Sequence, residues 1–164
     1  SIADKKIVTG VAASTNDAKL TLIGIKDKPG VAAEILSVLA DDGINVDMIV
    51  QNISDDRKTT DLTCTVPSDE SIRAKELMEG LSSNLSYKDL IVDTNISKIS
   101  IVGVGMRSNA GVASQMFRVL SENNINIDVI STSEIKISVL INKDLTEKAL
   151  NTLHDHFELG NISN

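Results

Sequence analysis

The sequence predicts an α+β fold of two βαββαβ units with antiparallel sheets, the first unit inserted within the second. Three observations carry this prediction. The segment Gly30–Val50 recurs 81 residues later as Gly111–Ser131, with 9 of 21 positions identical. Each copy runs from an apolar strand through a glycine-containing loop and an amphipathic helix to a second strand. A strand-like segment, 6–12, precedes both copies and belongs to neither.

The first copy opens with the β-rich run Leu20–Ile25, which ends before Pro29 because proline cannot pair inside a sheet. A helix follows, and Gly43 is predicted to end it. Its apolar face recurs with helical spacing at Ala32, Ile35, Leu36, Leu39 and Ala40. The remaining elements are strands at 44–51, 60–66 and 90–92, a polar turn at 55–58, and a helix marked by Ala74, Leu77, Met78 and Leu81.

The second copy repeats this order but lacks a last strand. Strands are predicted at 99–104, 125–131 and 135–141, with helix faces at Ala113, Met116, Phe117 and Leu120 and at Ala149, Leu150, Leu153 and Phe157. Only Leu159 and Ile162 are apolar after Phe157, which is too little for a strand. We therefore expect 7–11 to complete the second unit. The predicted domains are 17–94 for the first unit and 1–16 plus 95–164 for the second.

Composition excludes several classes of function. The formal net charge of −7 disfavours nucleic acid and anionic membranes as partners. Aromatic residues make up 2% of the chain, so the stacking residues of an RNA-recognition sheet are missing and the core must be aliphatic. The single cysteine, Cys64, excludes an internal disulfide and is predicted to be a buried strand residue. A lone thiol is consistent with a cytoplasmic protein.

The loop before the first helix of each copy is the candidate binding site. A helix N-terminus offers unpaired backbone N–H groups and the positive end of a dipole, which suit a carboxylate or phosphate. Gly30 and Gly111 would let such a ligand approach the backbone closely. A glycine that merely makes the turn is the alternative for either copy alone, but the recurrence favours a ligand.

Enzyme signatures are not found. Gly103–Gly105 begins like a dinucleotide-binding motif, but Ser108 stands where the third glycine is needed. The sequence has no phosphate-binding Walker loop, no Ser-His-Asp arrangement and no metal-spaced Cys/His cluster, so we expect no catalytic residue and no metal site. Arg107 could hold a phosphate, as in acylphosphatases of the same βαββαβ class, and this enzyme is an alternative reading.

Several segments together resemble the tandem ACT domains of aspartate kinase. The first ACT domain is matched by 26–32 and 44–52, the second by 131–135 and 137–140, and the start of the regulatory region by 10–12 and 18–22. The resemblance covers nearly the whole chain. It implies the ferredoxin-like ACT fold and the regulatory portion of an enzyme that phosphorylates L-aspartate in lysine, threonine and methionine biosynthesis.

The resemblance also implies what the chain lacks. Catalysis, with its ATP and Mg²⁺, would reside in a kinase portion outside this chain, so no cofactor is expected here. The chain is then either a separately translated regulatory (β) subunit or a segment of a longer enzyme. The effectors of the family are threonine, lysine or both, and ACT modules generally bind them between two modules.

Matching positions assign two effector sites. The first uses Asp27, Lys28, Pro29, Gly30, Val31, Ala32 and Gln51, closed by Asn126 and Ile127. The second uses Met106, Val112, Ala113, Asn45, Val46, Asp47, Ser133 and Glu134. The amide of Gln51 can donate and accept, which suits the threonine hydroxyl, while Asp47 and Glu134 are candidate partners of a lysine ammonium. The second loop lacks the Asp-x-Pro-Gly pattern, which favours threonine over lysine.

The expected mechanism is allosteric inhibition, in which the effector favours one arrangement of modules that the kinase portion senses. The expected assembly is a homodimer in which the first module of one chain meets the second module of the other. A stand-alone amino-acid sensor of ACT type is the nearest alternative.

Overall fold

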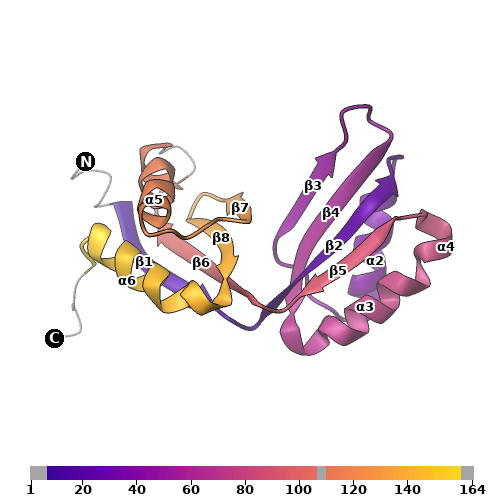
Figure 1. Cartoon of the computed structure of the whole chain (residues 1–164), viewed down its shortest axis with the longest axis horizontal. Helices are drawn as coiled ribbons and strands as arrows, with labels where there is room; N and C mark the ends of the chain where they lie inside the picture. Colours follow the sequence, from indigo (N-terminus) through magenta and orange to yellow (C-terminus); the bar gives the residue numbers. More distant parts are fainter. Residues whose placement is uncertain (1–6, 107–109, 160–164) are drawn as a thin grey trace. The chain divides into compact units, whose positions relative to one another are not determined.

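The computed structural model describes residues 7–106 and 110–159, and the chain divides into two compact units. The first unit is Asn16–Thr94, and the second combines Ser1–Thr15 with Asn95–Asn164. Each contains a four-stranded antiparallel sheet with its longer helices on one face (Figure 1). The predicted α+β fold, with the first unit inserted into the second, is confirmed.

In the first unit the strands lie in the order β3-β4-β2-β5, so β4 and β2 are central. Its elements are β2 (Asp17–Lys26), α2 (Val31–Asp41), β3 (Ile49–Ile53), β4 (Thr59–Pro67), η1 (Ser68–Glu70), α3 (Ser71–Gly80), α4 (Ser82–Leu85) and β5 (Asp89–Asp93). The order of strands and helices is βαββαβ.

In the second unit the strand order is β1-β6-β8-β7. Its elements are β1 (Val8–Ser14), β6 (Ile96–Gly103), α5 (Ala110–Glu122), β7 (Val129–Thr132), β8 (Lys136–Asn142), η3 (Lys143–Leu145) and α6 (Thr146–His156). Strand β1 pairs antiparallel with β6, from Ser14 opposite Lys98 to Val8 opposite Gly103. It therefore takes the edge position that β5 takes in the first unit.

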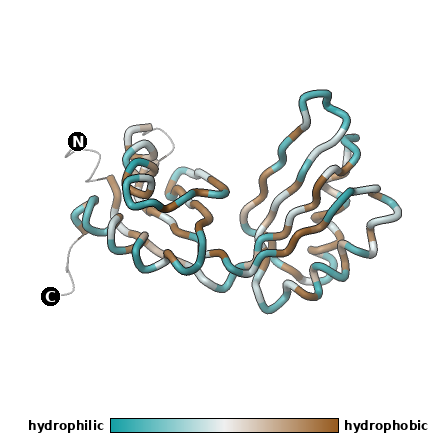
Figure 2. The backbone as a smooth tube through the Cα atoms, viewed as in Figure 1, coloured by the Kyte–Doolittle hydropathy of each residue, from teal (hydrophilic) through white to brown (hydrophobic). Residues whose placement is uncertain are grey.

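Each unit has its own aliphatic core between sheet and helices, and Figure 2 shows hydrophobic residues along the central strands. The first core includes Leu20, Leu22, Ile35, Leu39, Leu62, Cys64 and Met78. The second includes Ile99, Ile101, Met116, Leu120, Val139 and Leu153. Cys64 is a buried strand residue, as predicted, and burial raises the pKa of its thiol to about 12.

The predicted strands 44–51 and 125–131 begin later than expected. Strand β3 starts at Ile49 and β7 at Val129. The Met48 N–H donates to the hydroxyl oxygen of Thr65 at 3.0 Å, which a regular ladder would not allow. The Asp47 N–H donates to the Thr65 carbonyl oxygen at 3.1 Å, and the Asp128 N–H donates to the Leu140 carbonyl oxygen at 2.9 Å. These bonds hold both segments against the sheet as loops.

Gly103 is a test of the packing between β6 and the N-terminal segment. A Cβ there would overlap the carbonyl oxygen of Ile7 and lie 2.9 Å from Sδ of Met106. We expect Gly103→Ala to lower the free energy of unfolding by about 1–3 kcal/mol in urea denaturation. Gly10→Ala is the control, because a Cβ at Gly10 meets nothing within 4 Å. Equal stability of the two variants would contradict the packing described.

Burial of Cys64 makes a second prediction. With a pKa of about 12, the thiol carries almost no thiolate at pH 8. We expect a disulfide reagent to label the native chain at least about a hundredfold more slowly than the chain unfolded in guanidinium, since labelling must wait for opening of the core. Immediate labelling under native conditions, followed by absorbance, would show that Cys64 is accessible.

Candidate functional site

The loop between β2 and α2 presents backbone donors at the start of a helix. Gly30 is the N-cap of α2 and has φ 89° and ψ −4°, a left-handed conformation that favours glycine. No side chain in the described part of the protein caps this helix. The first-turn N–H groups after Gly30 therefore point toward the loop, where an anion can accept from them.

The loop is anchored to the β3–β4 hairpin. The Asp27 N–H donates to the Lys58 carbonyl oxygen at 2.9 Å, and the Val31 N–H to the Lys28 carbonyl oxygen at 3.3 Å. Asp27 is half-buried, whereas Val31 belongs to the core. Asp27 can therefore offer its carboxylate to a ligand, whereas the Val31 side chain is buried and its N–H is bonded within the loop.

Of the other predicted loop residues, Lys28 and Pro29 are exposed and Ala32 is half-buried against the core.

Gln51 lies on the edge strand β3, directly opposite Leu62. Residues opposite each other project to the same face, so Gln51 shares the helix-covered face with Leu62. Its neighbours on that face, Ile49 and Ile53, are 48% and 46% exposed although their partners on β4 are buried. The edge of this sheet thus extends beyond the helices and presents an amide between two isoleucines.

The corresponding loop of the second unit is anchored in the same way but differs in chemistry. The Met106 N–H donates to the Glu134 carbonyl oxygen at 2.9 Å, as the Asp27 N–H does to Lys58. The Met106 side chain, however, is 1% exposed and belongs to the core, as does that of Val112. Both can face a ligand only through their backbone.

Ser133 and Glu134 form the turn of the β7–β8 hairpin. The Ser133 N–H donates to the Lys136 carbonyl oxygen at 2.8 Å, and the Lys136 N–H donates to Ser133 Oγ at 3.3 Å. This turn lies beside Met106 through the bond to Glu134. Ala113 is half-buried against the second core. Arg107, the basis of the acylphosphatase alternative, lies outside the described residues.

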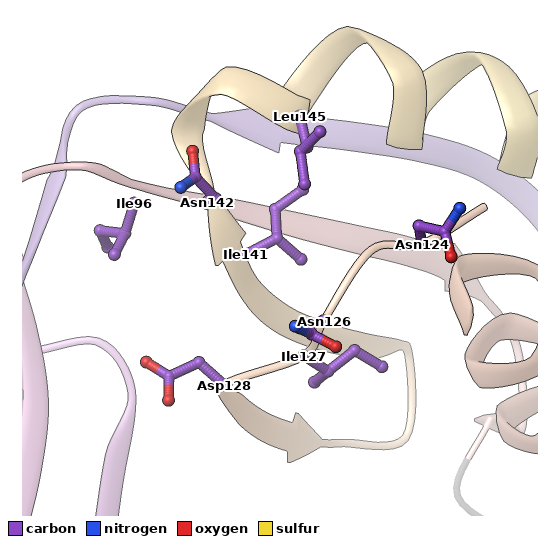
Figure 3. A pocket seen from close by; sticks show the side chains of 8 residues that line it. All are labelled: Ile96, Asn124, Asn126, Ile127, Asp128, Ile141, Asn142 and Leu145. Atoms are coloured by element: carbon purple, nitrogen blue, oxygen red, sulfur yellow. The ribbon is translucent and has the colours of Figure 1, made fainter. Parts of the chain in front are cut away.

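The repeat contains an Ile-Asn-aliphatic-Asp segment in each copy, at 44–47 and at 125–128. Each of these segments borders a cavity within its own unit. In the first unit a cavity of about 330 Å³ is lined by Leu36, Ala40, Gly43, Ile44, Asn45, Val46 and Ile49. In the second unit a cavity of about 400 Å³ is lined by Ile96, Asn124, Asn126, Ile127, Asp128, Ile141, Asn142 and Leu145 (Figure 3). The predicted residues Asn45, Val46, Asn126 and Ile127 therefore line cavities.

The sequence reasoning did not assign three further polar residues of the larger cavity, namely Asn124, Asp128 and Asn142. Asn124 has φ 59° in the left-handed region, at the position that Gly43 holds after α2. The Asn142 side chain accepts from the Asp144 N–H at 2.8 Å and caps η3. Asn124 and Asn142 are each typical of a helix boundary, which the sequence indicates. They lie on separate elements, however, so apolar periodicity does not predict that they line one cavity.

Within the part of the chain that the structure describes, the histidines have structural surroundings rather than a catalytic arrangement. His156 is hydrogen-bonded to Gln115 at 2.8 Å and stacks edge-on against Phe157, which is a packing role. No group of three or more His, Cys, Asp or Glu residues that could hold a metal is found in 7–106 and 110–159. Over the same residues no helix is long and apolar enough to cross a membrane.

Comparisons with known proteins show which family the fold and sequence match. A family model described as ACT domain matches residues 20–79 and 99–157. An aspartate kinase from Stutzerimonas stutzeri is 48% identical over 156 residues, which cover 95% of this chain and 38% of that protein. The chain thus spans little more than a third of the length of this relative.

Two solved structures are similar over nearly their whole length. A chain in a crystal structure of aspartokinase alpha and beta subunits is 44% identical with a TM-score of 0.86, covering 93% of this chain and 99% of that one. The ligand-free regulatory subunit of aspartate kinase from Thermus thermophilus is 38% identical with a TM-score of 0.86, covering 91% and 97%.

Proposed function

The chain belongs to the ACT-domain family, as the regulatory region of an aspartate kinase, and we propose that it binds threonine and thereby inhibits an attached kinase portion. Lysine is the second candidate effector. The kinase portion, with its ATP and Mg²⁺, would lie in a separate subunit or elsewhere in a longer chain.

The observation that carries this proposal is the loop of the first unit. The N-terminus of α2, without a side-chain cap, suits the carboxylate of a free amino acid. The half-buried carboxylate of Asp27 on the same loop suits its ammonium group. Gln51, exposed on the edge strand β3 of the same sheet, can bind a hydroxyl as donor and as acceptor. Threonine carries these three groups together.

Lysine fits the second unit less directly. Its loop lacks the Asp-x-Pro-Gly pattern, and the position of Asp27 corresponds to Ser108, which lies outside the described residues. An ammonium group there would have to use Glu134 on the hairpin or Asp47 from a first unit. We therefore assign threonine to the first loop and propose lysine as the effector of the second.

Regulation requires that the effector bind one arrangement of modules better than another. We propose a homodimer in which the edge strand β3 of one chain meets β7 of the other, where Asn126 and Ile127 would close the site. The exposed isoleucines of β3 and Ile130 of β7, which is 47% exposed, support this assembly, because uncovered apolar edges favour pairing with another strand.

Threonine binding can be measured by titration calorimetry. We expect Asp27→Asn and Gln51→Ala each to weaken threonine binding about tenfold or more, since each removes a hydrogen-bonding partner of a polar ligand group. Asp55→Asn is the control, because Asp55 lies exposed in the β3–β4 hairpin. The absence of heat with either threonine or lysine at millimolar concentration would contradict the proposed function.

The dimer can be measured by light scattering after size exclusion. We expect Ile53→Lys to shift the chain toward monomer, because a charge would be buried at the proposed strand edge. Ile72→Lys is the matched control, since Ile72 is 76% exposed on α3, away from both edges. Equal dissociation by both variants, or a monomeric wild type, would contradict the proposed interface.

A further inference from the structure

Strand β2 contains an irregularity just before the candidate site. It pairs with β4 residue for residue from Asp17 to Leu22, and the register then shifts before Ile25. Leu22 lies opposite Leu62 and Ile25 opposite Thr60. Ile23 and Gly24 therefore share the single position of Asp61 on β4, which is a β-bulge.

The bulge inverts the alternation of the strand. Leu20 and Leu22 face the core, and Ile25 is also fully buried in it. In a regular strand Ile25 would face the opposite side and Lys26 would turn toward the helices. The extra residue leaves Lys26 exposed and Asp27 half-buried, as observed. It thus decides which of the two side chains, a cation or an anion, lies on the helix side at the end of the strand.

Asp61 holds this bulge. Its Oδ1 accepts a hydrogen bond from the Gly24 N–H at 2.9 Å. This bond satisfies a backbone donor that the bulge removes from the regular pairing with β4. Gly24 has φ 71°, and a Cβ there would lie 2.9 Å from Cγ and Cδ of Lys88. The Lys88 N–H in turn donates to the Ile23 carbonyl oxygen at 2.8 Å. Glycine and a carboxylate opposite it are therefore the two requirements of the bulge.

The corresponding strand pair of the second unit has no bulge between Ile96 and Val102. Strand β6 pairs with β8 one for one from Ile96 to Val102. Lys136, opposite Val102, stands where Asp61 stands in the first unit. The position of Asp27 corresponds in the repeat to Ser108, which lies outside the described residues. The bulge, its carboxylate and the loop aspartate occur together in the first unit.

We propose that Asp61 is a positioning residue for the first effector site. It does not contact the amino acid, but by holding the Gly24 N–H it keeps Asp27 on the helix side of the sheet, and so sets recognition of the ligand's ammonium group. This inference rests on the proposed function, in which Asp27 binds that ammonium.

Substitutions at Asp61 test the proposal with two measurements. Asp61→Ala removes the acceptor, and Asp61→Asn keeps an oxygen at Oδ1 without the charge. We expect Asp61→Ala to weaken threonine binding about tenfold and to abolish the exchange protection of the Gly24 amide in NMR, and Asp61→Asn to restore both largely. Thr63→Ala is the control: it removes the 3.2 Å contact with Thr21 on the same strands, outside the bulge, and should change neither.

The outcomes separate cleanly. Wild-type affinity in Asp61→Ala despite loss of Gly24 protection would overturn the positioning role. Equal loss of affinity in Asp61→Asn and Asp61→Ala would overturn it too, because the charge would then matter rather than the bulge. If Asp61→Ala does not fold, Asp61→Glu displaces the acceptor and should show the same loss. A wild type that binds neither amino acid overturns the proposed function itself, and Gly24 exchange still shows whether Asp61 holds the bulge.

Discussion

The antiparallel pairing of β1 with β6 is the interaction on which the architecture depends. It brings the start of the described chain to the edge of a sheet whose other strands follow residue 95, so the second unit is built from segments on both sides of the first. Val8 on β1 contributes directly to the second core. The first unit is joined covalently to the second at two places, between β1 and β2 and between β5 and β6. Each junction has two residues, so the units are connected by two short links and not by a long flexible linker.

The order of elements, the faces of the helices and the insertion could all be predicted from the sequence, because each depends on apolar periodicity or on a missing strand. The loops 44–48 and 125–128 could not, since they are held by bonds such as that from Met48 to the Thr65 hydroxyl. The bulge in β2 could not be predicted for a similar reason. Ala18, Leu20 and Leu22 predict a regular strand, and the local sequence does not indicate that the Gly24 N–H will donate to a side chain 37 residues away. Site residues on one loop could be predicted, whereas the polar lining of the larger cavity, drawn from separate elements, could not.

The two copies keep their backbone and differ in their chemistry. Equivalent hydrogen bonds anchor Asp27 and Met106, and Gly43 and Asn124 both end a helix in the left-handed conformation. Formal charge follows the same division: residues 16–94 hold 15 acidic and 8 basic side chains, and the rest of the chain holds 8 of each. The whole net charge of −7 therefore belongs to the first unit. Such a field acts with opposite sign on the ammonium and the carboxylate of a zwitterion, so recognition of a neutral amino acid in the first unit depends on local groups such as Asp27.

This divergence limits how the repeat can work as a sensor. Helix N–H groups such as those at the start of α2 suit the carboxylate common to all amino acids and cannot distinguish between amino acids. Discrimination must come from groups that differ between the units, such as the half-buried Asp27, which follows a bulged strand in the first unit, whereas strand β6 of the second unit is regular. The bulge changes the face of every later residue in β2, and the bond from the Gly24 N–H to Asp61 Oδ1 lies within it. The same βαββαβ fold can thus carry two loops of different chemistry.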